Sequence, residues 1–180
     1  MTILTHDELL QLDAIDAPVE HINPASIEVT LGRRFYIERN DPWIVRPGVS
    51  VVDFFKRDLP LQLVELAEGE SMLLKPGAFA LAETQEWFDL PLNIVAEYVL
   101  KSSQARRAWG HLLAGYCDPG WHGSRLTMEF VNHSQFEPLL LTPGVKCGQM
   151  KFHAVTPVPE DKSYRVTGRY NNQTTVQSAK

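Results

Sequence analysis

Cysteine is scarce in this sequence, since only Cys117 and Cys147 occur among 180 residues. Two cysteines are too few for the disulfide framework of a small secreted domain, so we expect two reduced thiols. The chain also lacks an apolar run approaching the roughly 20 residues of a membrane helix, and residues 1–8 lack a signal-peptide layout. These absences favour a soluble, cytoplasmic protein (host cytoplasm, if the chain is viral) with no membrane partner.

Basic residues are fewer than acidic residues in this sequence. Lysine and arginine total 17 against 22 aspartates and glutamates, which gives a net charge of −5. Sequence-independent binding of nucleic acid needs many Lys and Arg contacts to phosphate. We therefore expect no nucleic-acid partner, and an anionic ligand has to meet a local cationic site.

No Gly/Ser linker or low-complexity tract divides the chain. Its length and its 44% hydrophobic content suit one domain, which we assign to residues 1–180. Residues 156–180 turn polar and lose apolar periodicity, and we expect them to form a C-terminal tail or lid.

The local patterns predict a mainly β fold. Thr5 and Glu8 form a T-x-x-E capping box, which predicts a short N-terminal helix. Three segments place Pro-Gly between apolar residues, a pattern typical of strand-turn-strand units: "IVRPGVSVV", "LLKPGAFAL" and "LLTPGVKCG". Further strand-like runs, "SIEVTLG", "RRFYIE" and "NIVAEYVL", favour an antiparallel sandwich or barrel.

The stretch "LKSSQARRAWGHLLAGYCDPGWHG", residues 100–123, combines serines, basic residues and a tight turn. Ser102 or Ser103 could cap a helix over residues 102–109, whose start would suit phosphate. Ser102 and Arg106 would then share one helix face, with Lys101 nearby. An ordinary capped, solvated basic helix explains the same spacing, and the stretch alone leaves both interpretations open.

The next segment, "SRLTMEFVN", alternates as a strand does. Leu126, Met128 and Phe130 would face the core. Glu129 would then lie on the other face, either as an ordinary exposed side chain or as a carboxylate that points into a site. Trp121, at the end of the preceding turn, could stack on a flat ligand or cover a core edge.

Six blocks in this order resemble the dCTP deaminase branch of the dCTP deaminase and dUTPase superfamily: "INPASIEVTLGRRF", "LLKPGAFALAETQEWFDLP", "KSSQAR", "AGYCDPGWHGSRLTMEFVN", "PGVKCGQMKF" and "RYNNQTT". The resemblance implies a dUTPase-like distorted β-barrel or sandwich, assembled as a homotrimer with sites shared between subunits. It implies hydrolytic deamination of dCTP to dUTP and ammonia, in the supply of dUMP and dTTP precursors.

The resemblance also implies roles for individual residues. Glu129 matches the general base and proton shuttle, while Ser102 and Arg106 match residues that organise the water and the base. Ala114 matches the position whose backbone carbonyl recognises the amino group or water, and Asp118 matches the acid that holds the 3′-hydroxyl. The resemblance assigns the triphosphate to Lys101, Ser102, Ser103, Gln149, Tyr164, Arg169 and Gln173; Trp121 is a further candidate nucleotide contact.

We expect no catalytic metal. Zinc-dependent nucleobase deaminases carry H-x-E and P-C-x-x-C motifs. This chain has no C-x-x-C, and its H-x-E, His6-Asp7-Glu8, lies in the proposed capping box. Mg²⁺ is expected only as the counterion of the triphosphate. Feedback inhibition by dTTP is a further implication of the resemblance.

The chain departs from the family pattern at several positions. Lys101 replaces the usual arginine and loses its bidentate fork. The segment between Arg106 and His111 is one residue shorter than usual, and Leu113 replaces a frequent threonine, which predicts an altered pocket floor. Three alternatives stay open: a preference for a modified cytosine nucleotide, a bifunctional enzyme that forms dUMP and pyrophosphate, and a regulatory protein that binds nucleotide without turnover.

Overall fold

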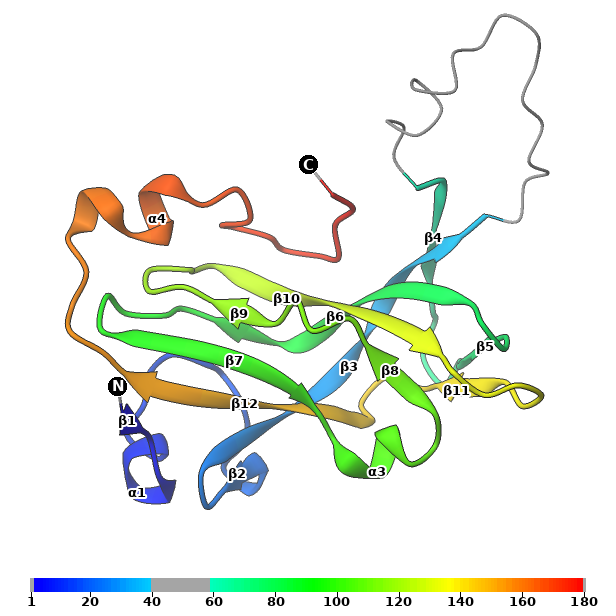
Figure 1. Cartoon of the computed structure of the whole chain (residues 1–180), viewed down its shortest axis with the longest axis horizontal. Coiled ribbons are helices and arrows are strands. Elements are labelled where there is room, and N and C mark those ends of the chain that lie inside the picture. The colour runs from blue at the N-terminus through cyan, green and yellow to red at the C-terminus, as the bar shows by residue number, and fades with distance from the viewer. Residues whose placement is uncertain (1, 40–58, 180) are drawn as a thin grey trace, which may run out of the picture.

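The structure is a computed structural model that describes residues 2–39 and 59–179. Figure 1 shows strands packed as a curled sheet, with the N-terminal helix and the C-terminal segment on its outside. The helices and helical turns are α1 (His6–Leu9), η1 (Val19–His21), α3 (Ser102–Ala105), η2 (Glu160–Lys162) and α4 (Tyr164–Thr167). The strands are β1 (Thr2–Ile3), β2 (Ile22–Asn23), β3 (Ser26–Glu38), β4 (Leu61–Glu65), β5 (Met72–Leu74), β6 (Phe79–Phe88), β7 (Ile94–Leu100), β8 (Trp109–His111), β9 (Tyr116–Cys117), β10 (Ser124–Asn132), β11 (Leu139–Leu141) and β12 (Lys146–Ala154).

Within the described residues, ten strands form one sheet, and seven of them follow the order β8-β10-β6-β3-β12-β7-β9. β1 joins β12, and both β2 and β4 join β3. β5 and β11 form a separate two-stranded sheet. The mainly β, dUTPase-like distorted barrel expected from the sequence is confirmed.

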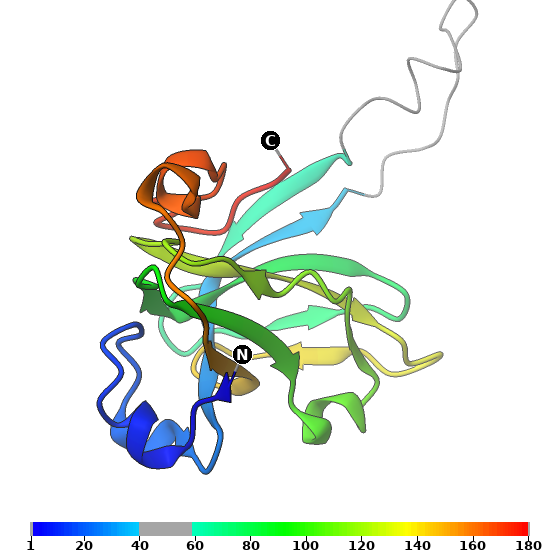
Figure 2. The same ribbon diagram turned by 60° about the vertical axis from the view of Figure 1, so that its left-hand side comes forward.

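The long strand β3 connects the two sides of the curled sheet, as Figures 1 and 2 show. Its first half pairs with β12, and its second half pairs with β6 and β4. The sequence suggested two shorter strands on either side of Gly32. The chain instead continues through this glycine as one strand, and a Cβ there would lie 2.5 Å from Cγ of Glu83 on β6. Gly32 therefore permits close strand packing and does not end the strand.

The Pro-Gly turns at residues 76–77 and 143–144 are confirmed. Gly77 and Gly144 have φ angles of 73° and 84°, which a side-chain-bearing residue rarely adopts. Each turn lies between two strands, β5 and β6 in one case and β11 and β12 in the other. The third segment, "IVRPGVSVV", lies outside the described residues.

The N-terminal helix is also confirmed as a single turn, α1. Oε2 of Glu8 accepts a hydrogen bond from the Thr5 backbone N–H at 2.8 Å, as a capping box requires. Leu9 is buried against the core. In the described part of the chain, no helix is long and apolar enough to cross a membrane.

The core fills the space inside the curled sheet. Its largest fully buried side chains include Phe35, Phe88, Phe130 and Phe152. Cys117 and Cys147 are both free and buried, and burial raises the pKa of each thiol to about 12. They pack as small apolar side chains.

Candidate functional site

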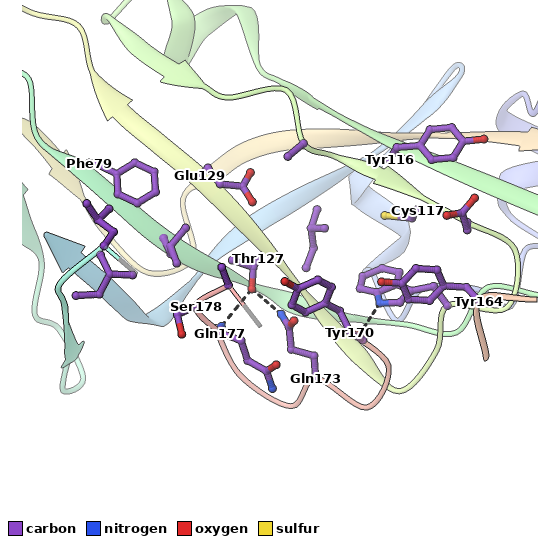
Figure 3. A pocket seen from close by; sticks show the side chains of 18 residues that line it. Phe79, Tyr116, Cys117, Thr127, Glu129, Tyr164, Tyr170, Gln173, Gln177 and Ser178 are labelled. Atoms are coloured by element: carbon purple, nitrogen blue, oxygen red, sulfur yellow. Dashed lines mark hydrogen bonds between the residues drawn. The ribbon is translucent and has the colours of Figure 1, made fainter. Parts of the chain in front are cut away.

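A cavity of about 480 Å³ lies between β10, the turn before it and the C-terminal tail. It brings together six of the residues singled out in the sequence: Ala114, Asp118, Trp121, Glu129, Tyr164 and Gln173. Figure 3 shows Glu129 and Thr127 on one strand, with the Gln173 side chain and the Gln177 backbone of the tail hydrogen-bonded to Thr127. Residues far apart in the sequence therefore form one concave site.

Glu129 reaches the cavity because β10 alternates. Leu126, Met128 and Phe130 are buried in the core, as predicted, and Glu129 points to the other face. Its side chain is 23% exposed. Its Oε2 atom is buried and accepts no hydrogen bond from the described residues. A buried carboxylate oxygen without a hydrogen bond costs stability, and such atoms are found where a site needs a free acceptor.

His111 is the residue near Glu129 that sequence reasoning missed. Its Nε2 lies 3.3 Å from Oε2 of Glu129, within ion-pair range, but the two atoms do not meet hydrogen-bond geometry. The ring of His111 also packs on that of Tyr98, with centroids 4.5 Å apart. The contact between His111 and Glu129 depends on the pairing of β8 with β10, in which His111 lies opposite Phe130. No local sequence signal reveals that pairing.

The turn before β10 builds one wall of the cavity. The Asp118-Pro119-Gly120 turn closes with a 3.1 Å hydrogen bond from the Trp121 N–H to the Asp118 carbonyl, and Gly120 has a φ of 87°. Asp118 stays exposed at the cavity. Trp121 was expected either to stack on a flat ligand or to cover a core edge. It is 5% exposed and packs on Phe88, and it also lines the cavity, so its position suits both roles.

The C-terminal tail folds back over this wall, as Figure 1 shows. Nε1 of Trp121 donates a 2.9 Å hydrogen bond to the Tyr170 carbonyl. The Arg125 N–H donates to the Gln173 carbonyl at 2.8 Å, and the Gln173 N–H donates to Oγ of Ser124 at 3.1 Å. The expected tail over the site is thus an ordered part of the cavity wall, fixed to β10 by its backbone.

Glu83 on β6 provides a second anchor for the tail. Its Oε2 accepts hydrogen bonds from Oγ1 of Thr175 and from the Val176 N–H, both at 2.9 Å. Glu83 is 4% exposed and lies opposite Thr127, which itself accepts a hydrogen bond from Nε2 of Gln173. One buried carboxylate therefore holds the segment that covers the strand of Glu129.

Replacing Glu83 with alanine should release the end of the tail. Hydrogen bonds to a charged group contribute about 1.5–3 kcal/mol each, so we expect amide hydrogen exchange of residues 173–177 to accelerate about tenfold or more. Exchange followed by mass spectrometry measures this, with Glu20→Ala, at an exposed acid of η1, as the control. Unchanged exchange in Glu83→Ala would show that Glu83 does not hold the tail.

The other predicted site residues do not line this cavity: Lys101, Ser102, Ser103, Arg106, Gln149 and Arg169. Arg169 nevertheless belongs to the tail, directly before the lining residue Tyr170. Figures 1 and 2 place α3, which carries the two serines, on the opposite side of the molecule from α4. Arg106 lines a separate hollow of about 540 Å³. One chain therefore separates the predicted site residues into two groups.

The helix predicted over residues 102–109 was too long. α3 ends at Ala105, Ala108 adopts a φ of 65°, and Trp109 enters β8 opposite Asn132. The predicted serine cap is also wrong, because Lys101 occupies the N-cap position and no side chain caps the turn. A single turn has too few aligned peptide groups for a strong helix dipole. Any phosphate contact here must come from individual side chains and N–H groups.

Leu113, expected to alter the pocket floor, is not part of the cavity within one chain. Leu113 is 89% exposed, has a φ of 62° and does not line the cavity. Among residues 2–39 and 59–179, no group of three or more His, Cys, Asp or Glu side chains is placed to hold a metal ion.

Comparison with known proteins assigns the family. A profile of the dCTP deaminase-like family matches residues 3–155. The chain is 33% identical over 169 residues to a protein of Dictyoglomus turgidum named "dCTP deaminase, dUMP-forming", covering 91% of this chain and 82% of that protein. It is 30% identical over 176 residues to a Natronomonas pharaonis protein named "dCTP deaminase", covering 95% and 86%. The dUMP-forming name recurs among relatives of comparable similarity.

The fold also matches a solved structure. The 2′-deoxycytidine 5′-triphosphate deaminase from Agrobacterium tumefaciens superposes with a TM-score of 0.64 at 23% identity, over 85% of this chain and 48% of that one. At this identity the match supports the fold alone. Taken with the profile and the sequence relatives, it leads to one assignment: the chain belongs to the dCTP deaminase-like family and is an enzyme of that family.

Proposed function

We propose that this enzyme hydrolyses the C4–amino bond of dCTP, with Glu129 as the general base. The observation that supports this most directly is the Glu129 carboxylate, which lines the cavity with one buried oxygen that no described residue hydrogen-bonds. The carboxylate is 23% exposed and can accept a proton from a water positioned against C4. We take dCTP as the substrate because relatives of this chain are named dCTP deaminase.

The proposed reaction needs two proton transfers. Glu129 takes a proton from water as the water oxygen bonds to C4, and it passes this proton to N3 as the C4=N3 double bond opens, so that the tetrahedral carbon carries a hydroxyl and an amino group. Glu129 then moves the hydroxyl proton to the amino nitrogen, the C4=O bond forms, and the C4–N bond breaks to release ammonia. The sum is dCTP + H₂O → dUTP + NH₃, and a positioned acid–base group of this kind contributes about 10²- to 10⁴-fold to a rate.

The remaining cavity residues suit the nucleoside. We assign the 3′-hydroxyl to Asp118, and the amino group or water to the backbone carbonyl of Ala114. The apolar face of Trp121 borders the same space. Tyr164 and Gln173 come from the tail, so they would contact the nucleotide only when the tail is closed.

We further propose that the site is completed by a second copy of the chain, in a homotrimer. Ser102 and Arg106 are needed near the water and base, but within one chain they lie outside the cavity of Glu129. Cyclic symmetry solves this problem, because each cavity can receive the α3 region of a neighbour and three equivalent sites form. Arg106 and Arg169 would then supply cationic contacts to the nucleotide.

Magnesium enters this proposal as part of the substrate, Mg²⁺·dCTP. Hard phosphate oxygens are its preferred ligands. No proposed step of deamination passes through a metal, because the water is activated by Glu129.

A second candidate function is favoured by the names of the relatives. Several are called dUMP-forming, which describes dCTP + 2 H₂O → dUMP + NH₃ + pyrophosphate. Asp118 lines the cavity and could help to activate the second water. This bifunctional reaction fits those relatives better than release of dUTP.

Product analysis separates the candidates. Metal-stripped enzyme is incubated with dCTP and Mg²⁺, the nucleotides and pyrophosphate are resolved by chromatography, and ammonia is assayed. Ammonia with dUTP indicates deamination alone, and ammonia with dUMP and pyrophosphate indicates the bifunctional reaction. Intact dCTP would contradict both and leave a nucleotide-binding regulator. A parallel titration with dTTP tests the proposed feedback inhibition.

A further inference from the structure

A β-bulge in β12 places Lys146 and Gln149 on the same face of the strand. In the pairing with β3, Lys146 lies opposite Thr30 and Gly148 opposite Val29, so two residues of β12 advance for one of β3. Cys147 and Gly148 are consequently both buried, while Lys146 and Gln149 are both half-buried. A bulge commonly re-aims a side chain in this way. The sequence here requires glycine, because a Cβ at position 148 would lie 2.0 Å from the Tyr98 ring.

Glu28 links this bulge to the segment that precedes α3. Its Oε1 contacts Nζ of Lys101, and its Oε2 contacts Nζ of Lys146. Glu28 also lies opposite Gln149, whose Oε1 accepts a 3.2 Å hydrogen bond from Oγ of Ser26. Lys146 of β12 and Lys101, the residue before α3, therefore flank one carboxylate. Lys101 and the nearby Gln149 are two of the residues already assigned to the triphosphate.

The charge balance of this cluster is positive. Burial alone would raise the pKa of Glu28, but its hydrogen bonds and charge interactions with the two lysines outweigh that effect and lower it. The carboxylate is thus ionised and neutralises one of two ammonium groups. The Lys146 side chain is 39% exposed and that of Lys101 is 24% exposed, against 10% for Glu28. The cations are therefore more accessible to a ligand than the anion between them.

We propose that Lys146 is a second cationic contact for the triphosphate, and that Glu28 is the internal counter-ion that positions both lysines for it. This inference rests on the proposed function. It also accounts for Lys101 in place of the arginine expected from the family resemblance. A lysine is a point charge without a bidentate fork, and two lysines held by one carboxylate restore the second point of contact.

The test compares Lys146→Met with Lys151→Met. Both lysines belong to β12 and both pair with a glutamate, but Lys151 pairs with Glu97, outside the cluster. We expect Lys146→Met to raise the KM for Mg²⁺·dCTP about tenfold, as expected for loss of one charged hydrogen bond, with kcat within about twofold. Lys151→Met should leave both constants unchanged. Thermal unfolding of each variant reports its fold.

Binding of inorganic triphosphate provides a readout that does not need turnover. Calorimetry should show weaker binding to Lys146→Met than to the unsubstituted protein and to Lys151→Met. If dCTP is not deaminated but this difference is found, the proposed function fails and the inference stands. Equal binding by all three proteins, or no binding of inorganic triphosphate at all, would overturn the inference. So would a Lys146→Met variant that loses thermal stability but keeps its KM, since the cluster would then be structural.

Discussion

Replacing Glu129 with glutamine should abolish deamination while leaving dCTP bound. The amide is nearly isosteric with the carboxylate but cannot take a proton from water at neutral pH. We expect kcat to fall about 10²- to 10⁴-fold, the usual contribution of a positioned general base. Ammonia release under single-turnover conditions measures the rate, and calorimetry with dCTP measures binding.

The control for this experiment is Glu97→Gln. Glu97 is a partly exposed glutamate that pairs with Lys151 on the surface of the sheet and does not line the cavity. We expect it to keep the unsubstituted rate. A Glu129→Gln enzyme that retains more than a tenth of the activity would contradict the role of Glu129. Loss of dCTP binding together with activity would point to a structural role for this side chain.

Two inactive variants should restore activity when they assemble together. Glu129→Gln damages the cavity, and Arg106→Ala damages the α3 region that we propose a neighbouring chain contributes. A site between two subunits is intact when the first supplies Glu129 and the second supplies Arg106. In a cyclic trimer that contains both variants, about one site in three has this intact pair, and purification by both tags selects such trimers. Co-expression with two affinity tags, followed by ammonia assay of the doubly purified mixture, measures the recovery.

The comparison for this experiment is the double variant that carries both substitutions in one chain. It should stay inactive at every mixing ratio with either single variant, because no added chain supplies the missing pair. If the two single variants fail to recover activity although they co-purify, the site is complete within one chain. The separation of Arg106 from Glu129 would then require movement within the subunit.

The parts of the fold that were predictable depend on contacts close in sequence. The two described Pro-Gly turns, the capped helix α1 and the alternation of β10 all follow from residues within a few positions of one another. The continuation of β3 through Gly32 and the early end of α3 depend instead on contacts with distant strands. Trp109 leaves the helix because it pairs with Asn132 and packs on Phe130. Local helix propensity cannot anticipate that.

In the candidate site, too, some residues could be identified from the sequence and others could not. The family resemblance identified five residues that the fold brings together in the cavity, among them Glu129 and Asp118, and the turn pattern suggested a sixth, Trp121. It did not identify His111 beside Glu129, Glu83 beneath the tail or Lys146 beside Glu28. Each of these contacts joins segments that are separated in the sequence, and two involve residues that resemble ordinary surface charges. Strand pairing and the bulge at residues 146–148 place them.

The most direct test of the proposed chemistry is the fate of the water oxygen. The enzyme is incubated with dCTP in water enriched in ¹⁸O, and the base of the product is analysed by mass spectrometry. The proposed mechanism predicts one ¹⁸O atom in the uracil ring, at C4, with loss of one nitrogen as ammonia, whichever phosphate product is released. An unlabelled cytosine base after prolonged incubation would contradict deamination by this enzyme, even if pyrophosphate were formed.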